Sequence, residues 1–226
     1  MSLAVLLHDN HLLAVAKPAG VPCVADASGD ESLQERAKAW LKREHDKPGE
    51  VYLAVVHRLD RPVSGVVLFA RTSKAAARLS DQWRRRAVAK GYLGVVEGVI
   101  QDDAGQVEQW LLKDPERNRV RAVPAPAADG GAAQFARTRW QVRARRRGRT
   151  LLELEPLTGR SHQLRVACAS LGHPLAGDLK YGASAPLADR SIALHACWLE
   201  FDHPTLRVAV RVEAPLPAGE PWGEFG

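Results

Sequence analysis

The sequence has little of what marks secreted or metal-dependent proteins. It contains three cysteines, Cys23, Cys168 and Cys197, and their odd number and wide spacing match neither a disulfide framework nor a zinc site. Buried, reduced thiols are therefore expected, which fits a reducing compartment. The histidines have no metal-ligand spacing with cysteine or carboxylate residues, so we expect no metal site.

Long apolar runs are also missing. Residues 1–20 lack the positive start and the apolar stretch of a signal peptide, because His8, Asp9 and Asn10 interrupt them. No segment approaches the length that spans a membrane. A phosphate-cradling glycine loop, a dinucleotide-binding fingerprint and an internal repeat are absent as well. These absences predict a cytoplasmic protein without a membrane partner.

The charge balance favours a polyanionic partner. Lys plus Arg number 32 against 26 Asp plus Glu, for a net charge of +6 and a pI near 9.5. Seven arginines fall between Arg137 and Arg149, and Arg84–Arg86 form a second cluster. Either run alone fits a solvated strand face or helix end, but the two together favour a surface that follows a phosphate backbone.

Three helices are predicted from capping signals and apolar spacing. Ser32, three residues before Glu35, has the capping-box spacing for a helix over 32–45. Thr72 or Ser73 is expected to begin a second helix that ends near residue 83. Ser161 is expected to cap a third, which stops before the glycine and proline at positions 172 and 174.

Strand-like segments outnumber the helices and are mostly consecutive. They cover residues 3–7, 12–16, 51–59, 65–70, 92–99, 107–112, 118–123, 134–145, 151–157, 192–201 and 206–212, with a loop at 124–133. This order predicts an α+β fold with a largely antiparallel sheet. The length suits one large domain or two small ones.

Asp60 is the first candidate for chemistry. It follows an apolar segment in a charged turn, with His57, Arg58 and Arg61 nearby. A carboxylate beside guanidinium groups is favoured in its charged form and can act as nucleophile or base. The alternative is an aspartate that caps a turn and forms a structural ion pair.

Two further segments carry polar groups suited to RNA. Tyr92 begins a strand behind Lys90, where a ring can stack on a base or simply pack at the edge of the core. At 157–165 a glycine turn enters a helix and is crowded with basic and polar side chains: Arg160, His162, Gln163 and Arg165. Positive charge at a helix start opposes the helix dipole, so a negative partner is expected there, and Asp60 is the carboxylate proposed.

Several blocks, taken in order, resemble the RluA-type pseudouridine synthase family. They are His57-Arg58-Leu59-Asp60 with Ser64-Gly65, Lys90-x-Tyr92, Leu157-Thr158-Gly159-Arg160-x-His162-Gln163-Leu164-Arg165, Lys17-Pro18-x-Gly20, Gly172-His173-Pro174-x-x-Gly177-Asp178 with Tyr181-Gly182, and Leu194-His195-Ala196. The resemblance runs from about residue 6 to residue 217. The loop at 173–182 otherwise shows only turn chemistry and receives no catalytic role.

The resemblance implies a pseudouridine synthase fold with an RNA-binding cleft, formed by residues 1–226 as one catalytic domain or as two subdomains sharing one sheet. It implies an isomerase that needs no cofactor and acts on a flipped-out uridine. Asp60 would be the catalytic aspartate, Tyr92 the stacking tyrosine and Arg165 the residue that pairs with Asp60. Leu164 would line the pocket, and Arg58 would hold the place of the flipped nucleotide.

Other residues of the matching blocks, His57, Arg61, Lys90, Arg160, His162 and Gln163, are expected to contact RNA. The family pattern has threonine where Val63 stands and commonly histidine where Ala167 stands, which affects neighbouring contacts rather than the catalytic set. The chain begins directly in the catalytic domain, so an N-terminal S4-type domain is not expected. The expected partner is a stem-loop of ribosomal or transfer RNA, bound by a monomer.

Two other functions remain open from the residues. A non-catalytic RNA-binding protein could keep the fold without the chemistry, although Asp60, Tyr92 and Arg165 are all present. A nucleic-acid glycosidase would cleave without rejoining, which usually needs a second carboxylate to activate water. No such partner lies close to Asp60 in sequence.

Overall fold

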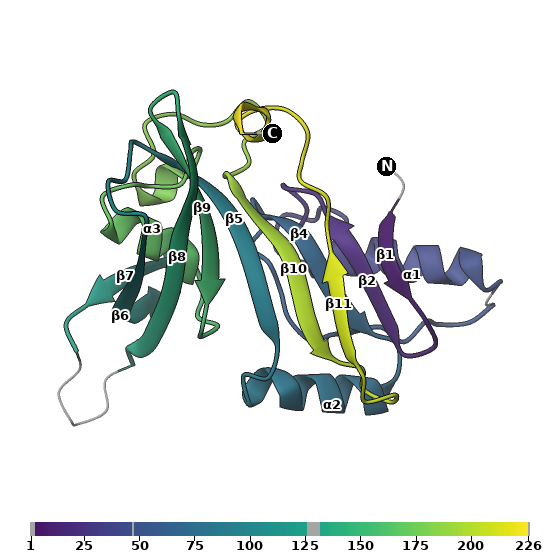
Figure 1. The fold of residues 1–226 in the computed structure, drawn as a ribbon. Helices are drawn as coiled ribbons and strands as arrows, with labels where there is room; N and C mark the ends of the chain where they lie inside the picture. Colours follow the sequence, from purple (N-terminus) through teal and green to yellow (C-terminus); the bar gives the residue numbers. More distant parts are fainter. Residues whose placement is uncertain (1–2, 47, 126–131, 226) are drawn as a thin grey trace. The chain divides into compact units, whose positions relative to one another are not determined.

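The computed structural model describes residues 3–46, 48–125 and 132–225, and within them the chain forms eleven strands and three α-helices (Figure 1). The chain divides into two compact units. Unit 1 comprises Met1–Lys90 and Ala196–Leu216, and unit 2 comprises Gly91–His195 and Pro217–Gly226. Each unit has its own helices and its own hydrophobic core.

The sheet of unit 1 is built around a fully buried strand, β4 (Ser64–Ala70). Strand β2 (Leu12–Lys17) pairs antiparallel with it, and β1 (Ala4–His8) pairs antiparallel with β2, as the sequence predicts for 3–7 and 12–16. On the other side lies β10 (Leu194–Asp202), which pairs with β11 (Ala209–Glu213). Since β4 has seven apolar or small residues in a row, it suits a position covered on both faces.

Two helices of unit 1 form as their capping signals predict. Helix α1 (Leu33–Glu44) starts at Ser32, whose side chain and that of Glu35 complete a capping box. Helix α2 (Ser73–Arg84) starts at Thr72, whose hydroxyl accepts a hydrogen bond from the backbone N–H of Ala75. The inner face of α2 packs on the core of β2, β4 and β10 through residues such as Leu79.

The prediction of a strand over 51–59 is wrong for most of its length. Only β3 (Ala54–Val55) is a strand, and it pairs with Ala70 and Phe69 at the end of β4. A strand has two edges, and the sequence cannot show that both edges of β4 are already used. Because β2 occupies one edge and β10 lies along the other, only the end of β4 is left for β3.

The sheet of unit 2 is antiparallel in every pairing described. Its strands lie in the order β5 (Ala89–Glu97), β9 (Arg149–Pro156), β8 (Gln134–Arg146), β6 (Ala104–Asp114) and β7 (Arg119–Val123). These confirm the predicted strands of this region. Of the predicted 124–133 loop, residues 126–131 lie outside the described residues. Two short 3-10 helices, η1 (Leu179–Tyr181) and η2 (Trp222–Glu224), complete the unit.

Helix α3 (Gln163–Ser170) begins one residue later than predicted, and His162 rather than Ser161 stands at its cap position. The residue before the helix is His162, whose left-handed backbone (φ 51°) turns the chain sharply into it. The helix has no side-chain cap, and the Gln163 amide oxygen instead holds the preceding turn by accepting hydrogen bonds from the Thr158 hydroxyl and the Arg160 N–H. The predicted stop is confirmed, with α3 ending before Gly172 (φ 80°).

The observed architecture is therefore α+β with a mainly antiparallel sheet, as predicted. None of the three cysteines, all of which lie in the described part of the chain, forms a disulfide; Cys23 and Cys168 are buried, and Cys197 is half-buried. In the part of the chain that the structure describes, no helix is long and apolar enough to cross a membrane.

Gly65 provides a test of the packing in unit 1. Its φ of +123° suits glycine, and an added Cβ would lie 2.5 Å from the Ala196 nitrogen and 2.7 Å from its carbonyl carbon. We expect Gly65→Ala to lower the free energy of unfolding by roughly 2–4 kcal/mol, measured by urea denaturation. Gly49→Ala is the control, because nothing lies within 4 Å of its added Cβ; equal losses in the two variants would contradict this account.

Candidate active site

Asp60 lies in a tight turn between β3 and β4. Its carbonyl oxygen accepts a hydrogen bond from the Val63 N–H at 3.0 Å, which closes the turn over Arg61 and Pro62 as predicted. Asp60 is half-buried, whereas Val63 is buried. Valine suits this position because a hydroxyl there would need a buried partner.

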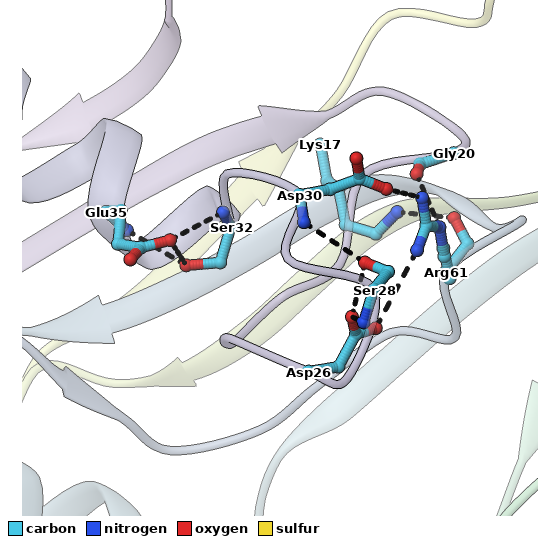
Figure 2. Close-up of polar contacts among 8 residues, drawn as sticks. All are labelled: Lys17, Gly20, Asp26, Ser28, Asp30, Ser32, Glu35 and Arg61. Carbon is cyan, nitrogen blue, oxygen red and sulfur yellow. Dashed lines mark hydrogen bonds and ion pairs between the residues drawn. The ribbon is translucent and has the colours of Figure 1, made fainter.

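The turn is fastened to the end of β2 by a buried lysine (Figure 2). Lys17 is only 2% exposed, and its Nζ donates hydrogen bonds of 2.9 Å to the carbonyl oxygens of Arg61 and Pro18. The Arg61 carbonyl also accepts a 2.8 Å bond from the Gly20 N–H. The residue next to Asp60 is therefore held by two donors, one at the end of β2 and one in the segment that follows it.

Burial lowers the pKa of Lys17 from 10.5 to about 8, an effect that interactions with Cys23 and Asp60 oppose and that the charge of Arg61 reinforces. The lysine thus stays near Asp60 as a positive charge at neutral pH. Its hydrogen bonds to carbonyl oxygens compensate part of the cost of burying this charge.

A buried thiol braces the other side of the turn. The backbone N–H of Leu59 donates to the Cys23 sulfur at 3.3 Å, and the thiol lies 3.4 Å from the Leu59 carbonyl oxygen. Burial raises the pKa of the Cys23 thiol, which keeps it protonated and able to donate. Residues on both sides of Asp60 are thus attached to the 17–23 segment.

Arg61 is already paired with carboxylates of unit 1. Its guanidinium donates to the Gly20 carbonyl at 2.9 Å and pairs with Asp30 and Asp26 (Figure 2). Ser28 joins these two acids, because its hydroxyl donates to Asp26 and accepts from the Asp30 N–H. An RNA phosphate that binds Arg61 would have to replace these partners, so the predicted RNA contact of Arg61 stays a prediction.

His57 makes internal contacts. Its Nε2 accepts a 2.9 Å hydrogen bond from the Leu68 N–H, and its ring stacks on Trp83 with centroids 4.6 Å apart. Burial, with a smaller contribution from Lys90, lowers the pKa of His57 to about 3, so the ring is neutral near pH 7. These contacts favour a role in positioning the Asp60 segment, while Arg58 beside it is exposed.

In unit 2, Arg165 forms a buried bidentate pair. Its Nε and Nη2 donate to the two carboxylate oxygens of Asp178, each at 2.7 Å, and both side chains are nearly inaccessible to solvent. The guanidinium also lies over the Tyr181 ring, 4.9 Å from its centroid. The Tyr181 hydroxyl lies 2.6 Å from His162 Nδ1 and accepts from the Val120 N–H.

Asp178 thus provides one negative partner for the basic side chains at the start of α3. The sequence predicts no role for this loop, whose one signal is the resemblance of Gly177-Asp178 and Tyr181-Gly182 to the family pattern. The predicted pairing of Arg165 with Asp60 would join the two units and stays a prediction.

Gln163 holds the turn before α3 together. Besides accepting two hydrogen bonds, its amide nitrogen donates to the Arg137 carbonyl at 2.9 Å and to the Thr138 hydroxyl at 3.0 Å. Two donors and two acceptors use the whole amide, which leaves no group for the predicted RNA contact. Arg160 donates to the Phe135 carbonyl through Nε, and Leu164 is buried.

Of the predicted site residues, His57, Arg58, Asp60, Arg61 and Lys90 belong to unit 1, and Tyr92, Arg160, His162, Gln163, Leu164 and Arg165 belong to unit 2. Tyr92 is half-buried on β5, opposite Leu154 of β9. Burial lowers the pKa of Lys90. Among the described residues, no group of three or more histidine, cysteine, aspartate or glutamate side chains could hold a metal ion.

The arginine run on β8 is largely balanced by acids on neighbouring strands. Arg137 pairs with Glu108 on β6, and Arg139 and Arg143 pair with glutamates on β9. Arg145 pairs with Asp103, just before β6. The predicted phosphate-following surface therefore has much less free positive charge here than the sequence suggests.

Comparison with known proteins identifies this arrangement as that of a pseudouridine synthase, a class of RNA-modifying isomerases. The solved structure of human RNA pseudouridylate synthase domain containing 4 superposes with a TM-score of 0.77 at 25% identity, over 95% of this chain and 88% of that one. A family model described as RNA pseudouridylate synthase matches residues 11–170. The chain belongs to this family.

Two similar proteins also bear the name pseudouridine synthase. The chain is 35% identical over 221 residues to the uncharacterized RNA pseudouridine synthase YhcT of Bacillus subtilis (strain 168), covering 96% of this chain and 69% of that protein. It is 33% identical over 223 residues to ribosomal large subunit pseudouridine synthase C of Escherichia coli (strain K12), with coverages of 95% and 67%.

The lowered pKa of Lys17 predicts a pH effect on stability. Between pH 8 and 10.5 the unfolded chain binds a proton that folded Lys17 has released, so raising the pH through this window favours the folded state. The gain is about 3 kcal/mol at most. Lys17→Met should remove this contribution, which urea denaturation of both proteins at pH 7.5 and 10.5 measures. An unchanged pH dependence in the variant would contradict the assignment.

Because the Arg165–Asp178 pair is buried, removing its acid should lower the free energy of unfolding more than removing an exposed acid. Asp178→Asn removes the charge opposite buried Arg165 and should lower the free energy of unfolding by about 3 kcal/mol. The control is Asp103→Asn, whose exposed pair with Arg145 should be worth less than about 1 kcal/mol. Similar shifts in the thermal midpoints of the two variants would show that burial of the pair does not matter.

Proposed function

We propose that this enzyme isomerises a specific uridine to pseudouridine in a stem-loop of ribosomal RNA, with Asp60 as the catalytic carboxylate. The observation that carries the proposal is the attachment of the Asp60 turn to a buried lysine. Lys17 and Gly20 hold Arg61, and Cys23 holds Leu59, so the backbone on each side of Asp60 is fixed. A reacting group on a fixed backbone has little orientational freedom to lose in the transition state.

The reaction needs rearrangement within one nucleotide and no co-reactant. The bond between uracil N1 and the ribose breaks, the base rotates, and C5 is joined to the ribose. The hydrogen on C5 is released to water and N1 gains a proton, so the atoms balance. Asp60 is the carboxylate that we assign to this step, as nucleophile or base.

The remaining predicted residues have supporting roles in the proposal. Tyr92 stacks on the target base, Leu164 lines its pocket, and Arg58 takes the place of the flipped-out nucleotide. Arg165, oriented by Asp178, pairs with Asp60. Direct RNA contacts are assigned to Arg61, Lys90, Arg160 and His162, whereas the contacts of His57 and Gln163 favour positioning roles.

Ribosomal RNA is preferred over transfer RNA as the substrate because the relative in E. coli is named for the large ribosomal subunit. We further propose that the protein works as a monomer in the cytoplasm. The absence of a disulfide among its three described cysteines fits a reducing compartment.

Tritium release tests the assignment of Asp60. Wild-type protein should release tritium from RNA labelled at uridine C5, using RNA from cells that lack the enzyme. Asp60→Asn keeps the shape of the side chain but not its charge, and it should lower the rate by at least roughly 1,000-fold. Asp46→Asn is the matched control, since Asp46 is exposed in a left-handed turn that asparagine also adopts.

The same assay separates the competing functions. Free uracil in place of a modified chain would indicate a glycosidase, and binding without tritium release would indicate a non-catalytic RNA-binding protein. Either result with wild-type protein would overturn the proposal, as would full activity in Asp60→Asn. Mapping the modified position in the labelled RNA would then identify the substrate uridine.

A further inference from the structure

A cavity of about 450 Å³ in unit 1 lies between α2 and the turn that joins β10 to β11. Its lining includes Arg78, Asp81 and Gln82 from the helix, Arg85 at its C-cap, and Asp202 and Arg207 from the strand end and turn. Figure 1 shows the β10–β11 turn beside α2. The volume falls in the range of small-ligand sites, roughly 300–1,000 Å³.

The helix residues of the lining share one face of α2. Positions 78, 81, 82 and 85 are spaced i, i+3, i+4 and i+7, which places their side chains in one row. Trp83 on the same helix stacks on His57, three residues before Asp60. Helix α2 therefore connects the cavity to the segment that carries the proposed catalytic residue.

The wall of the cavity is held together by hydrogen bonds. The buried Gln82 amide donates to the Asp202 carbonyl at 2.7 Å and accepts from the Asp202 N–H at 2.9 Å. Arg78 Nη1 donates to the Pro204 carbonyl at 2.5 Å, and buried His203 contacts Asp9 at 2.7 Å. These bonds fix the turn against the helix before any ligand binds, which lowers the entropy lost on binding.

The cavity has an excess of positive charge. Arg78, Arg85 and Arg207 face two acids, and one of these, Asp81, is shared by Arg84 and Arg85. The dipole of α2 favours arginines in its last turn, but this does not explain Arg78 or Arg207. Arg207 is exposed and has a left-handed backbone (φ 59°), a conformation that favours glycine or asparagine.

We propose that this cavity binds the phosphodiester backbone of the RNA substrate, as an anchoring site separate from the residues assigned to the reacting uridine. The inference rests on the proposed function for the identity of the RNA. Guanidinium groups bind phosphate oxygens through paired N–H donors, and here they come from a helix and a turn that are fixed to each other. Arg78 and Arg207 are the residues assigned to the phosphate.

Arg207→Gln is the test, because this exposed side chain can be replaced without disturbing the core. Binding of a fluorescently labelled fragment of the substrate RNA is followed by anisotropy at several salt concentrations. Loss of one phosphate contact should weaken binding roughly three- to tenfold at low salt and reduce the slope of log K against log salt by about one. In the tritium assay, KM should rise while kcat is unchanged, because the contact is the same in the ground and transition states.

Arg43→Gln is the matched control, since Arg43 is exposed on α1 and its replacement changes the net charge equally. The proposal is supported if only Arg207→Gln lowers the slope. It is overturned if both variants lower it equally, or if neither does. It is also overturned if Arg207→Gln weakens binding of polyglutamate but not of RNA, because the cavity would then serve an acidic protein.

Failure of the proposed function would be recognised separately. Wild-type protein that bound RNA with the predicted dependence on Arg207 but released no tritium would leave the anchoring site intact and remove the isomerase assignment. Tritium release with no effect of Arg207→Gln on RNA binding would support the isomerase assignment and overturn the anchoring site. Arg78→Gln provides a second variant, with circular dichroism to verify its folding, since Arg78 also holds the turn.

Discussion

The candidate site of unit 1 depends on a charged ammonium group that is almost completely removed from water. Lys17 is at the end of β2, directly beside buried β4, and its two hydrogen bonds go to backbone carbonyls. Carbonyl oxygens carry no formal charge, so they stabilise the ammonium without neutralising it. The positive charge therefore acts on the Asp60 turn while its geometry holds that turn in place. Because burial disfavours the charged form of Lys17, the folded state is less stable at neutral pH than at a pH where Lys17 is uncharged.

In unit 2 a buried positive charge is stabilised in a different way. There the buried charge is Arg165, and a full carboxylate, Asp178, binds it through two parallel hydrogen bonds. A paired guanidinium keeps a fixed orientation, and the Tyr181 ring and His162 extend this order to the turn before α3. In both units the side chains proposed for chemistry are held by buried polar groups that form hydrogen bonds within the protein. This fits catalysis by electrostatic preorganisation, in which the protein groups are ordered before the substrate arrives.

Local signals in the sequence predicted the parts of the fold that depend on neighbouring residues. The capping residues of α1 and α2 lie within three positions of their partners, so both helix starts were predictable. The 51–59 strand was overpredicted because the edges of β4 are occupied by residues distant in sequence. Cross-strand register likewise decides that the β8 arginines face acids, which their clustering alone did not show. Asp178 was missed because its partner lies thirteen residues away across a loop. Lys17 was visible only as part of a motif, since burial of a lysine has no signature of its own.

The lowered pKa of Lys17 also makes the amine a reporter of local motion. Near pH 8 a large fraction of such a lysine is uncharged and would be a good nucleophile toward acylating reagents, but its burial excludes them. Acylation then requires a transient opening of the 17–23 segment, and its rate measures how often that opening occurs. Because the same opening would release the backbone beside Asp60, the acylation rate of Lys17 and the order of the Asp60 turn both depend on this one local equilibrium. RNA that binds only the closed form would slow the labelling in proportion to its occupancy.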